Sequence, residues 1–223
     1  MLVSPNLRKF LTTKGRTNLK IINSSVEILD KINAKEILDK IEIAGRTCWA
    51  SEPNSTPQEI FLKNIINRKH ESVLEHASIT VRFICDRGVT HEIVRHRIAS
   101  YSQQSTRYCN YTKDKFGNEI TVIKPAGLDE DSELYALWKQ GCEDAERNYF
   151  ALVKAGAKPD LARGVLPTDV KTILVMTANI REWRHFFTLR CDEAAHPNIR
   201  VLAKDLLHQF KEQIPILFDD IDF

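Results

Sequence analysis

The side chains best suited to binding a ligand are concentrated in one polar segment, residues 95–108. It contains three arginines, three serines and two adjacent glutamines, with only two aliphatic side chains. Arginine guanidinium groups bind phosphate through paired hydrogen bonds, and nearby hydroxyl groups can fill the remaining oxygen sites. Glutamine amides can match the donor and acceptor edge of a base. The composition therefore indicates a site for a phosphorylated, base-bearing small molecule.

Two simpler interpretations of this segment remain open on composition alone. It has no apolar stripe at the helical or the strand period, which is also typical of a solvated basic loop. Residues 97–100, Arg-Ile-Ala-Ser, match a common phosphorylation pattern as well. The order of the residues, rather than their types, favours the ligand site.

That order resembles the signature of the flavin-dependent thymidylate synthases, an Arg-His-Arg followed at fixed spacing by a serine. Seven residues separate Arg97 from Ser105, and Arg107 lies two positions further on. Other matches extend the resemblance over residues 20–213. The resemblance implies that a methylene group passes from methylenetetrahydrofolate to C5 of dUMP, giving dTMP. It also implies FAD as the cofactor, recharged by NADPH, to supply the hydride that completes the methyl group.

The same resemblance implies which residues hold the flavin. In the family these contacts come from three separated segments that meet at the subunit interfaces of a homotetramer, so each active site is shared between chains. Ser72 lies in a His-Glu-x-x-x-Glu-His block that begins at His70, a position near the ring system. The positions assigned to FAD are Ser72, Arg95, His96, Arg97, Gln103, Asn179, Ile180, Arg181 and His185.

A second set of positions is assigned to dUMP by the resemblance. Ser105 and Arg107 are expected to bind its phosphate. Arg190, the expected catalytic residue, matches an arginine that favours the ionised N3 of uracil, an electrostatic effect that activates C5. Its simpler interpretation is an ion pair with Asp192 or Glu193. The positions assigned to dUMP are Glu92, Ile93, Val94, Arg95, Gln103, Gln104, Ser105, Thr106, Arg107, Arg163 and Arg190.

The chain departs from the family pattern at three of these positions. The family carries Glu where this chain has Gln103, Gln where it has Glu92 and Asn where it has His185. The first two departures exchange one carboxylate and one amide. The nucleotide site would therefore keep its total charge while the carboxylate changes place.

No metal site and no glycine-rich nucleotide fold are expected. The two histidines of residues 70–76 are not at the i, i+4 spacing of a helical zinc site, and the run 91–95 lacks the second histidine of His-Glu-x-x-His. The chain has neither Gly-x-Gly-x-x-Gly nor a Walker motif, so a Rossmann or P-loop fold has no support. Arg95 and Arg97 are the candidates for holding a flavin pyrophosphate.

The length and composition of the chain limit its domain organisation, its partners and its location. A chain of 223 residues that is 43% hydrophobic can bury a core within one domain, which we place at residues 20–223. Residues 1–19 form a basic stretch without an acid, expected as a short surface extension rather than a transit peptide. A net charge of +2 gives no drive toward nucleic acid or membrane. Five scattered cysteines without a Cys-x-x-Cys pair indicate reduced thiols in a cytoplasmic protein.

The strands that must position the site follow from β-rich or alternating stretches. Residues 78–86 alternate apolar and polar side chains, as a half-buried strand does. Strands interspersed irregularly with helices predict a mixed α/β fold with a largely antiparallel sheet, because the spacing does not suit regular βαβ units. The residues predicted as strands are 20–29, 78–86, 119–124 and 168–178.

Helices are predicted where apolar side chains recur at helical spacing, and capping signals set their ends. Thr56 is expected as the N-cap of one helix, and Gly45 is expected to close the helix before it. Leu134 and Leu137 are expected on the buried side of the longest helix. The residues predicted as helical are 34–44, 56–69, 89–95 and 129–155, with two further helices beginning near Ile180 and Pro197.

Two other classes of function compete with the enzyme. A nucleic-acid-binding module could use residues 95–108 as a stacking and phosphate platform, although the near-neutral charge and the single basic patch argue against it. A structural or binding protein without flavin is the third possibility. The visible absorption spectrum of the purified protein separates the three.

Overall fold

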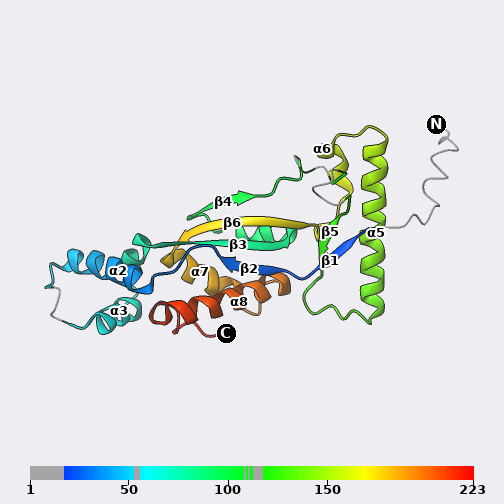
Figure 1. Ribbon diagram of the computed structural model, residues 1–223. Helices are drawn as coiled ribbons and strands as arrows, with labels where there is room; N and C mark the ends of the chain where they lie inside the picture. The colour runs from blue at the N-terminus through cyan, green and yellow to red at the C-terminus, as the bar shows by residue number, and fades with distance from the viewer. Residues whose placement is uncertain (1–17, 53–55, 108, 110, 113–117) are drawn as a thin grey trace. The chain divides into compact units, whose positions relative to one another are not determined.

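The computed structural model describes residues 18–52, 56–107, 109, 111–112 and 118–223 (Figure 1). Its fold is mixed α/β with a four-stranded antiparallel sheet and a small parallel pair, so the predicted fold class is confirmed. Internal contacts divide the chain into two compact units, and each is described by itself. The smaller unit comprises residues 1–23 and 104–172, and the larger comprises 24–103 and 173–223. The single domain over 20–223 stays a prediction, and most of the 1–19 extension lies outside the described residues.

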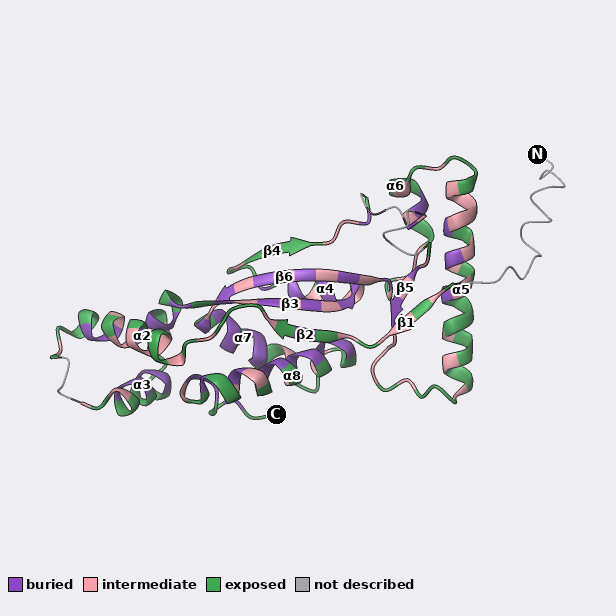
Figure 2. Cartoon of the chain, in the orientation of Figure 1, coloured by how far each residue is buried: buried purple, intermediate pink, exposed green. Residues whose placement is uncertain are grey.

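The larger unit is built on the four-stranded sheet, in the order β2-β3-β6-β4. Figure 2 shows its central strands buried along much of their length and its edge strands mostly exposed. The alternation predicted for residues 78–86 is confirmed with the same bounds, because every second side chain from Ile79 to Cys85 is buried. The strands are β2 (Ser25–Ile28), β3 (Ser78–Asp86), β4 (Ala99–Gln103) and β6 (Lys171–Asn179).

Helices of the larger unit bury their apolar sides against this sheet and against one another. Helices α7 and α8 pack together and cover one face of the sheet (Figure 1). The inward face predicted for α8, from Ile199 to Phe210, is confirmed as buried. The helices are α2 (Ala34–Trp49), α3 (Gln58–Asn67), η1 (Glu71–His76), α4 (Arg87–Ile93), α7 (Ile180–Arg190), α8 (Pro197–Gln213) and η4 (Pro215–Leu217).

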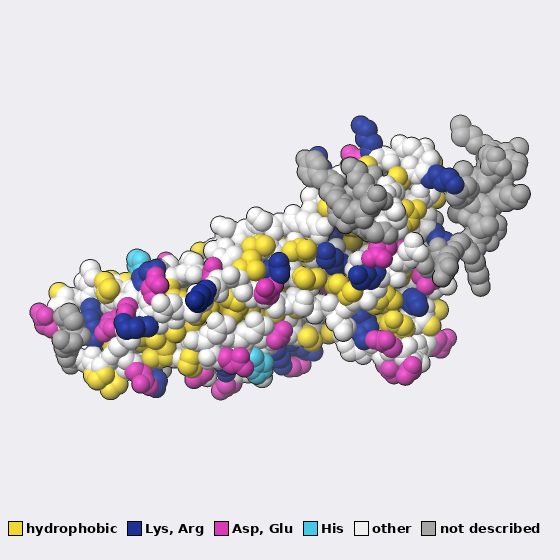
Figure 3. Space-filling view, in the orientation of Figure 1, with side chains coloured by type: hydrophobic (Ala, Val, Ile, Leu, Met, Phe, Trp, Pro, Cys, Tyr) yellow, Lys and Arg dark blue, Asp and Glu magenta, His cyan; other side chains and the backbone are white. Residues whose placement is uncertain are grey.

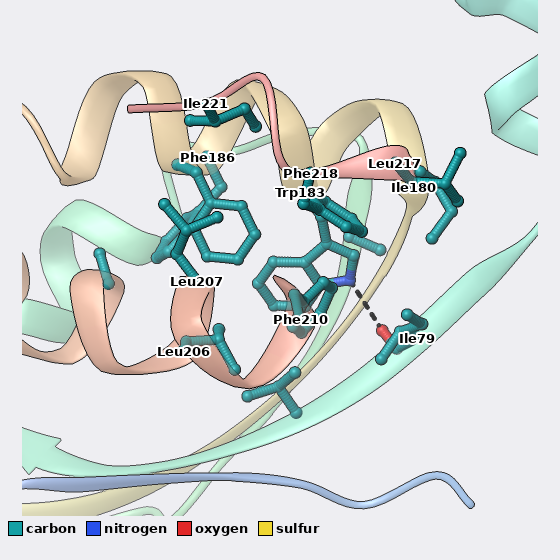
Figure 4. Packing of buried hydrophobic residues seen from close by; sticks show 14 of the residues in the cluster. Ile79, Ile180, Trp183, Phe186, Leu206, Leu207, Phe210, Leu217, Phe218 and Ile221 are labelled. Atoms are coloured by element: carbon teal, nitrogen blue, oxygen red, sulfur yellow. Dashed lines mark hydrogen bonds between the residues drawn. The ribbon is translucent and has the colours of Figure 1, made fainter. Parts of the chain in front are cut away.

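Trp183 of α7 lies at the centre of the larger core (Figure 4). Its ring is fully buried and packs against Phe186, Phe187 and Phe210, with ring centroids 5.5 to 6.1 Å away. The indole N–H donates to the carbonyl of Ile79 on β3 at 3.0 Å. Aromatic packing plus one satisfied polar group fixes α7 against the sheet, and α7 carries several of the expected site residues.

The smaller unit pairs two short strands beside a long helix. The pair β1–β5 is parallel, with Ile21 opposite Val122. The buried carboxylate of Glu146, on α5, accepts the backbone N–H groups of Asn18 and Ile120 at 3.1 and 3.0 Å. The elements are β1 (Lys20–Ile22), β5 (Thr121–Ile123), α5 (Glu133–Lys154), α6 (Pro159–Ala162) and η3 (Arg163–Val165).

Three predicted elements differ from the structure. The single strand predicted at 20–29 is two strands in two sheets, since the polar residues 23–24 interrupt the pairing. The helix from 34 continues past Gly45 to Trp49. Thr56 is not an N-cap, because α3 begins at Gln58 without a side-chain cap.

Two further expectations were wrong in detail. Leu134 and Leu137 are 69% and 63% exposed, because the buried residues of α5 lie from Cys142 onward. Helix α4 spans Arg87–Ile93 rather than the predicted 89–95. The strand β4 within the signature was not predicted, and it forms because its backbone pairs with β6 at the sheet edge.

Gly45 marks a close approach of two helices. A Cβ atom at this position would meet a ring carbon of Phe61 at 3.0 Å and Cδ1 of Ile65 at 3.1 Å, whereas one at Gly141 of α5 would meet nothing within 4 Å. Gly141→Ala is therefore expected to raise the free energy of unfolding by up to about 1 kcal/mol through helix propensity. Gly45→Ala is expected to lower it by about 1–2 kcal/mol through overpacking. Urea denaturation of both variants tests this, and equal stabilisation by both would contradict the close approach.

Candidate functional site

The Arg-His-Arg of the signature occupies the tight turn between α4 and β4, within the larger unit. Asp86 caps α4 by accepting from the backbone N–H of Val89 at 2.7 Å, and it also accepts from the Asn198 amide of α8 at 3.0 Å. The hydroxyl of Tyr101 lies 2.9 Å from the carbonyl of Ile93 and 2.5 Å from that of His96. These contacts anchor both ends of the turn, so its side chains have defined directions.

The three signature side chains divide into two exposed arginines and one buried histidine. Arg95 and Arg97 are exposed, and Arg95 Nε donates to the carbonyl of His91 at 3.3 Å. The His96 side chain between them is only 3% exposed. The guanidinium groups are thus presented at the surface, where an anionic ligand can reach them, while the imidazole faces the protein interior.

His96 joins two charged groups that are distant in the sequence. Its Nδ1 lies 3.0 Å from Oε1 of Glu182, which is also buried. Its Nε2 accepts a hydrogen bond from Nε of Arg190 at 3.1 Å. Because an arginine Nε always carries its proton, His96 Nε2 must be the unprotonated nitrogen and Nδ1 must carry the hydrogen that is donated to Glu182.

Arg190 is held on a second side by Glu92. Its Nη1 donates to the Glu92 carboxylate and its Nη2 to the Glu92 carbonyl, each at 3.0 Å. The alternative ion pair with Asp192 or Glu193 is not formed, since Glu193 instead pairs with Arg200. A guanidinium group has five N–H bonds, and three are used here. Among the described residues, one N–H on each of Nη1 and Nη2 therefore remains for a ligand.

The environment of His96 keeps its ring neutral. Burial, followed by the charges of Arg190 and His185, lowers the pKa of His96 from 6.5 to about 4. Burial likewise raises the pKa of the Glu182 carboxyl above its ordinary value. A neutral imidazole is the only form that can accept from Arg190, so the electrostatics agree with the hydrogen-bond geometry.

This shift predicts a pH dependence of stability. Between about pH 4 and 6.5 the unfolded chain binds a proton at His96 and the folded protein does not, so stability falls as the pH falls through this window. We expect the term to reach at most about 3 kcal/mol near pH 4. Urea denaturation at fixed protein concentration, from pH 7 to pH 4, measures it. His96→Gln should lose this component and exposed His91→Gln should keep it; equal slopes in the two variants would contradict the assignment.

A set of three possible metal ligands lies at the same place. Ligand atoms of His96, Glu182 and His185 fall within 4.8 Å of one another. Both ring nitrogens of His96 already have protein partners, and the positive Arg190 is hydrogen-bonded to one of them. A cation would have to displace that arrangement, so we assign the set no metal role.

The second expected flavin segment, at the start of α7, is tied to the η1 helix. Asn179 is the N-cap and accepts from the backbone N–H of Glu182 at 2.8 Å. Arg181 is half-exposed and pairs with Glu75 of η1 at 2.6 Å. Ser72 is exposed on that same short helix. The structure thus connects the Ser72 and Asn179 segments, which lie more than a hundred residues apart.

Several expected ligand positions in the larger unit differ in accessibility. Ile93 and Ile180 are fully buried and serve the core, whereas Val94 is 43% exposed. His185 is exposed, with its ring 5.6 Å from that of His96. Gln103 donates from its amide to the Thr90 hydroxyl of α4 at 3.1 Å.

The remaining expected dUMP positions lie in the smaller unit. Arg163 donates to the hydroxyl of the buried Thr106 at 3.0 Å, which joins the η3 turn to the signature loop. The Ser105 hydroxyl accepts from the backbone N–H of exposed Arg107 at 3.2 Å. Lys171 Nζ donates to the Gln104 side chain at 3.5 Å. The unit therefore holds these positions through two separate contacts, Arg163 with Thr106 and Lys171 with Gln104.

Sequence reasoning missed three residues that organise these sites. Glu182 and Tyr101 fix the signature turn and its histidine, and Lys171 supports Gln104; burial lowers the pKa of Lys171. A glutamate three residues after an N-cap asparagine gives a capping signal in the sequence, but nothing there points to His96. Their roles depend on contacts across the fold.

A depression in the described part of the larger unit lies away from these residues. It has a volume of about 810 Å³ and runs along α2 beside residues that adjoin the undescribed stretch 53–55. Arg46 lines it, and this buried side chain donates to the carbonyls of Glu52 and Thr56 and lies over the Phe61 ring. None of the expected site residues lines this depression, and we assign it no ligand.

Comparison with known proteins agrees with this architecture. Residues 28–216 match the family model described as thymidylate synthase complementing protein. The chain belongs to this family. Among curated relatives, the flavin-dependent thymidylate synthase of Geobacter sulfurreducens is 38% identical over 189 residues, covering 81% of this chain and 80% of that protein.

Relatives from other lineages carry the same description. The flavin-dependent thymidylate synthase of Pyrococcus furiosus is 40% identical over 170 residues, which cover 74% of this chain and 69% of that protein. The one from Mycobacterium avium is 35% identical over 202 residues, covering 82% and 78%. The resemblance found in the signature therefore extends over most of the chain.

Proposed function

We propose that this chain is a flavin-dependent thymidylate synthase that reductively methylates dUMP to dTMP. The observation that carries the proposal is the placement of Arg190. Its guanidinium group is locked by His96 and Glu92 at the signature turn, with two N–H bonds left for a ligand among the described residues. Membership in the family and the names of its relatives support the same reaction.

The residues fit FAD in their chemistry. Arg95 and Arg97 are exposed guanidinium groups suited to a pyrophosphate, and Ser72 and Arg181 are accessible polar groups on elements joined by an ion pair. When bound, the flavin would supply hydride for the methyl group. The residues proposed to hold it are Ser72, Arg95, His96, Arg97, Gln103, Asn179, Ile180, Arg181 and His185. Because their side chains are buried, His96 would contact the flavin through its main chain or ring edge and Ile180 through its main chain.

For dUMP, the proposal distributes roles by chemistry. Ser105 and Arg107 bind the phosphate, since a hydroxyl and an exposed guanidinium group lie two residues apart. Arg190 stabilises negative charge on the uracil ring as N3 ionises, which raises electron density at C5. The other proposed contacts are Glu92, Ile93, Val94, Arg95, Gln103, Gln104, Thr106 and Arg163.

Two finer parts of the proposal, the co-substrates and the assembly, rest on the family pattern. Methylenetetrahydrofolate is the one-carbon donor and NADPH the reductant. The functional form is a homotetramer with active sites shared between chains. We also propose a cytoplasmic location, which the five unpaired cysteines support. In the described part of the chain, no helix has the length and apolar character required to cross a bilayer.

The nucleic-acid-binding alternative is not supported. On the face shown in Figure 3, Lys and Arg side chains are interspersed with Asp and Glu rather than gathered into one basic area. A platform for a nucleic-acid backbone requires a continuous positive surface.

The test is a spectrum followed by an assay. The purified protein should be yellow or take up FAD stoichiometrically, and it should then form dTMP from dUMP and methylenetetrahydrofolate with NADPH. A colourless protein that shows no FAD binding by calorimetry would end the proposal. Light scattering tests the assembly separately, because an active monomer would exclude shared sites.

A further inference from the structure

Glu182 is a buried carboxylate to which the family resemblance assigns no role. It lies in the first turn of α7 and is 6% exposed, and its Oε1 atom faces Nδ1 of His96 at 3.0 Å. Burying a carboxylate is costly unless a specific partner compensates for the lost water. A cap residue for α7 is already present, since Asn179 accepts from the Glu182 backbone N–H. The Glu182 side chain is therefore directed to the histidine rather than to the helix end.

The hydrogen bonds form a chain with one direction. Arg190 Nε donates to His96 Nε2, and His96 Nδ1 donates to Glu182. Each link determines the next, because a neutral imidazole has one donor and one acceptor. We propose that Glu182 is a positioning residue for Arg190, acting by holding the His96 ring in the orientation that presents Nε2 to Arg190. The inference rests on the proposed function, since the orientation of Arg190 matters to catalysis only if it acts on the uracil ring.

Loss of the Glu182 acceptor would leave the Nδ1 hydrogen of His96 buried without a partner. The imidazole ring would then be held from one side only, by Arg190, and would turn toward another acceptor. Turning the ring carries Nε2 away from Arg190, so the guanidinium group would lose its His96 contact while Glu92 still held its other end. Among the described residues, the aromatic rings beside His96 are those of His185 and Phe186, at centroid distances of 5.6 and 5.0 Å. Neither offers a carboxylate to replace Glu182.

Two substitutions separate positioning from packing. Glu182→Leu keeps the approximate side-chain volume and removes the hydrogen-bond acceptor. It should lower kcat for dTMP formation at least tenfold, a loss typical of mutating residues that support the ligands of a site. FAD affinity should change little. Glu182→Gln keeps an oxygen that can accept from Nδ1 and removes the charge, so it should retain most of the activity. If the Glu182 carboxylate were purely structural, the hydrogen-bond acceptor of Glu182→Gln would not restore the activity that Glu182→Leu loses.

A readout independent of activity reports the His96 ring directly. Nitrogen-15 NMR of histidine-labelled protein distinguishes protonated from unprotonated ring nitrogens, and loss of one signal in His96→Gln assigns the residue. We expect a hydrogen-bonded Nδ1–H that exchanges slowly with water in the unmodified protein and in Glu182→Gln, and an Nδ1–H that is shifted and exchanges faster in Glu182→Leu. Glu146→Gln is the matched control, because that carboxylate is equally buried but accepts backbone N–H groups. It should change neither the His96 signal nor kcat.

The outcomes separate this inference from the proposed function. A hydrogen on Nε2 in the unmodified protein, or a Glu182→Leu variant with full kcat, would overturn the positioning role. If Glu182→Leu does not fold, Glu182→Gln decides: loss of the Nδ1–H hydrogen bond or a tenfold loss of kcat there also overturns the positioning role. If the unmodified protein forms no dTMP, the proposed function falls, and the NMR signal still decides whether Glu182 controls His96.

Discussion

Replacing Arg190 with alanine is expected to lower kcat for dTMP formation by about 10²–10³-fold, the effect of removing one preorganised donor from a site of developing charge. The side chain is 15% exposed and anchored at three N–H groups, so its remaining donors need no reorganisation when charge develops on the uracil. Single-turnover kinetics with reduced flavin would measure the chemical step, and FAD and dUMP affinities would be measured alongside.

The matched control is the adjacent Cys191→Ala. Cys191 is fully buried, and burial raises the pKa of its thiol to about 11, so it is a poor nucleophile at neutral pH. Burial raises the pKa of Cys142 to about 12 in the same way. Cys191→Ala should therefore leave the chemical step largely intact. Trapping a covalent adduct of dUMP on any cysteine, or an Arg190→Ala enzyme with normal turnover, would contradict this mechanism.

The sequence predicted those elements whose burial is decided locally. The strand at 78–86 and the helix from Pro197 were correctly placed because each alternates or repeats its apolar side chains against one buried face. The glycine at position 45 was misjudged for the opposite reason. Its small size serves contact with Phe61 in another helix, and no local signal distinguishes such a glycine from a helix terminator.

The exposure of individual residues could not be predicted from local sequence patterns either. Leu134 and Leu137 fit the apolar period of α5 but lie on turns that the smaller core does not cover. The strand β4 has a polar sequence, and it exists because β6 offers its backbone at the sheet edge. Both depend on which partner is present rather than on the residues themselves.

For the site, the motif located the exposed ligand groups but not the groups that orient them. The positions of Arg95, Arg97 and Arg190 could be named from the sequence by their resemblance to a family. The orientation of the His96 ring could not, because it depends on Glu182, 86 residues away. Contacts of this range carry no local pattern, yet they decide which nitrogen faces Arg190.

Trp183→Ala is expected to lower the free energy of unfolding by about 3–5 kcal/mol, the usual cost of a large buried aromatic. The ring is fully buried and contacts aromatic side chains from β3, α7 and α8, so its removal leaves a cavity at the junction of all three (Figure 4). The carbonyl of Ile79 would also lose its indole partner. Urea denaturation at fixed protein concentration measures the change.

Two further variants separate the contributions to this loss. Trp183→Phe should cost less than alanine, because it keeps a ring in the cavity and loses mainly the indole hydrogen bond. Trp49→Ala, at a side chain that is 47% exposed, should cost clearly less than Trp183→Ala. Because α7 also carries Arg181 and His185, which are proposed to hold FAD, the alanine variant should also weaken FAD binding as the helix loosens. Equal costs at Trp49 and Trp183 would contradict the assignment of Trp183 to the centre of the core.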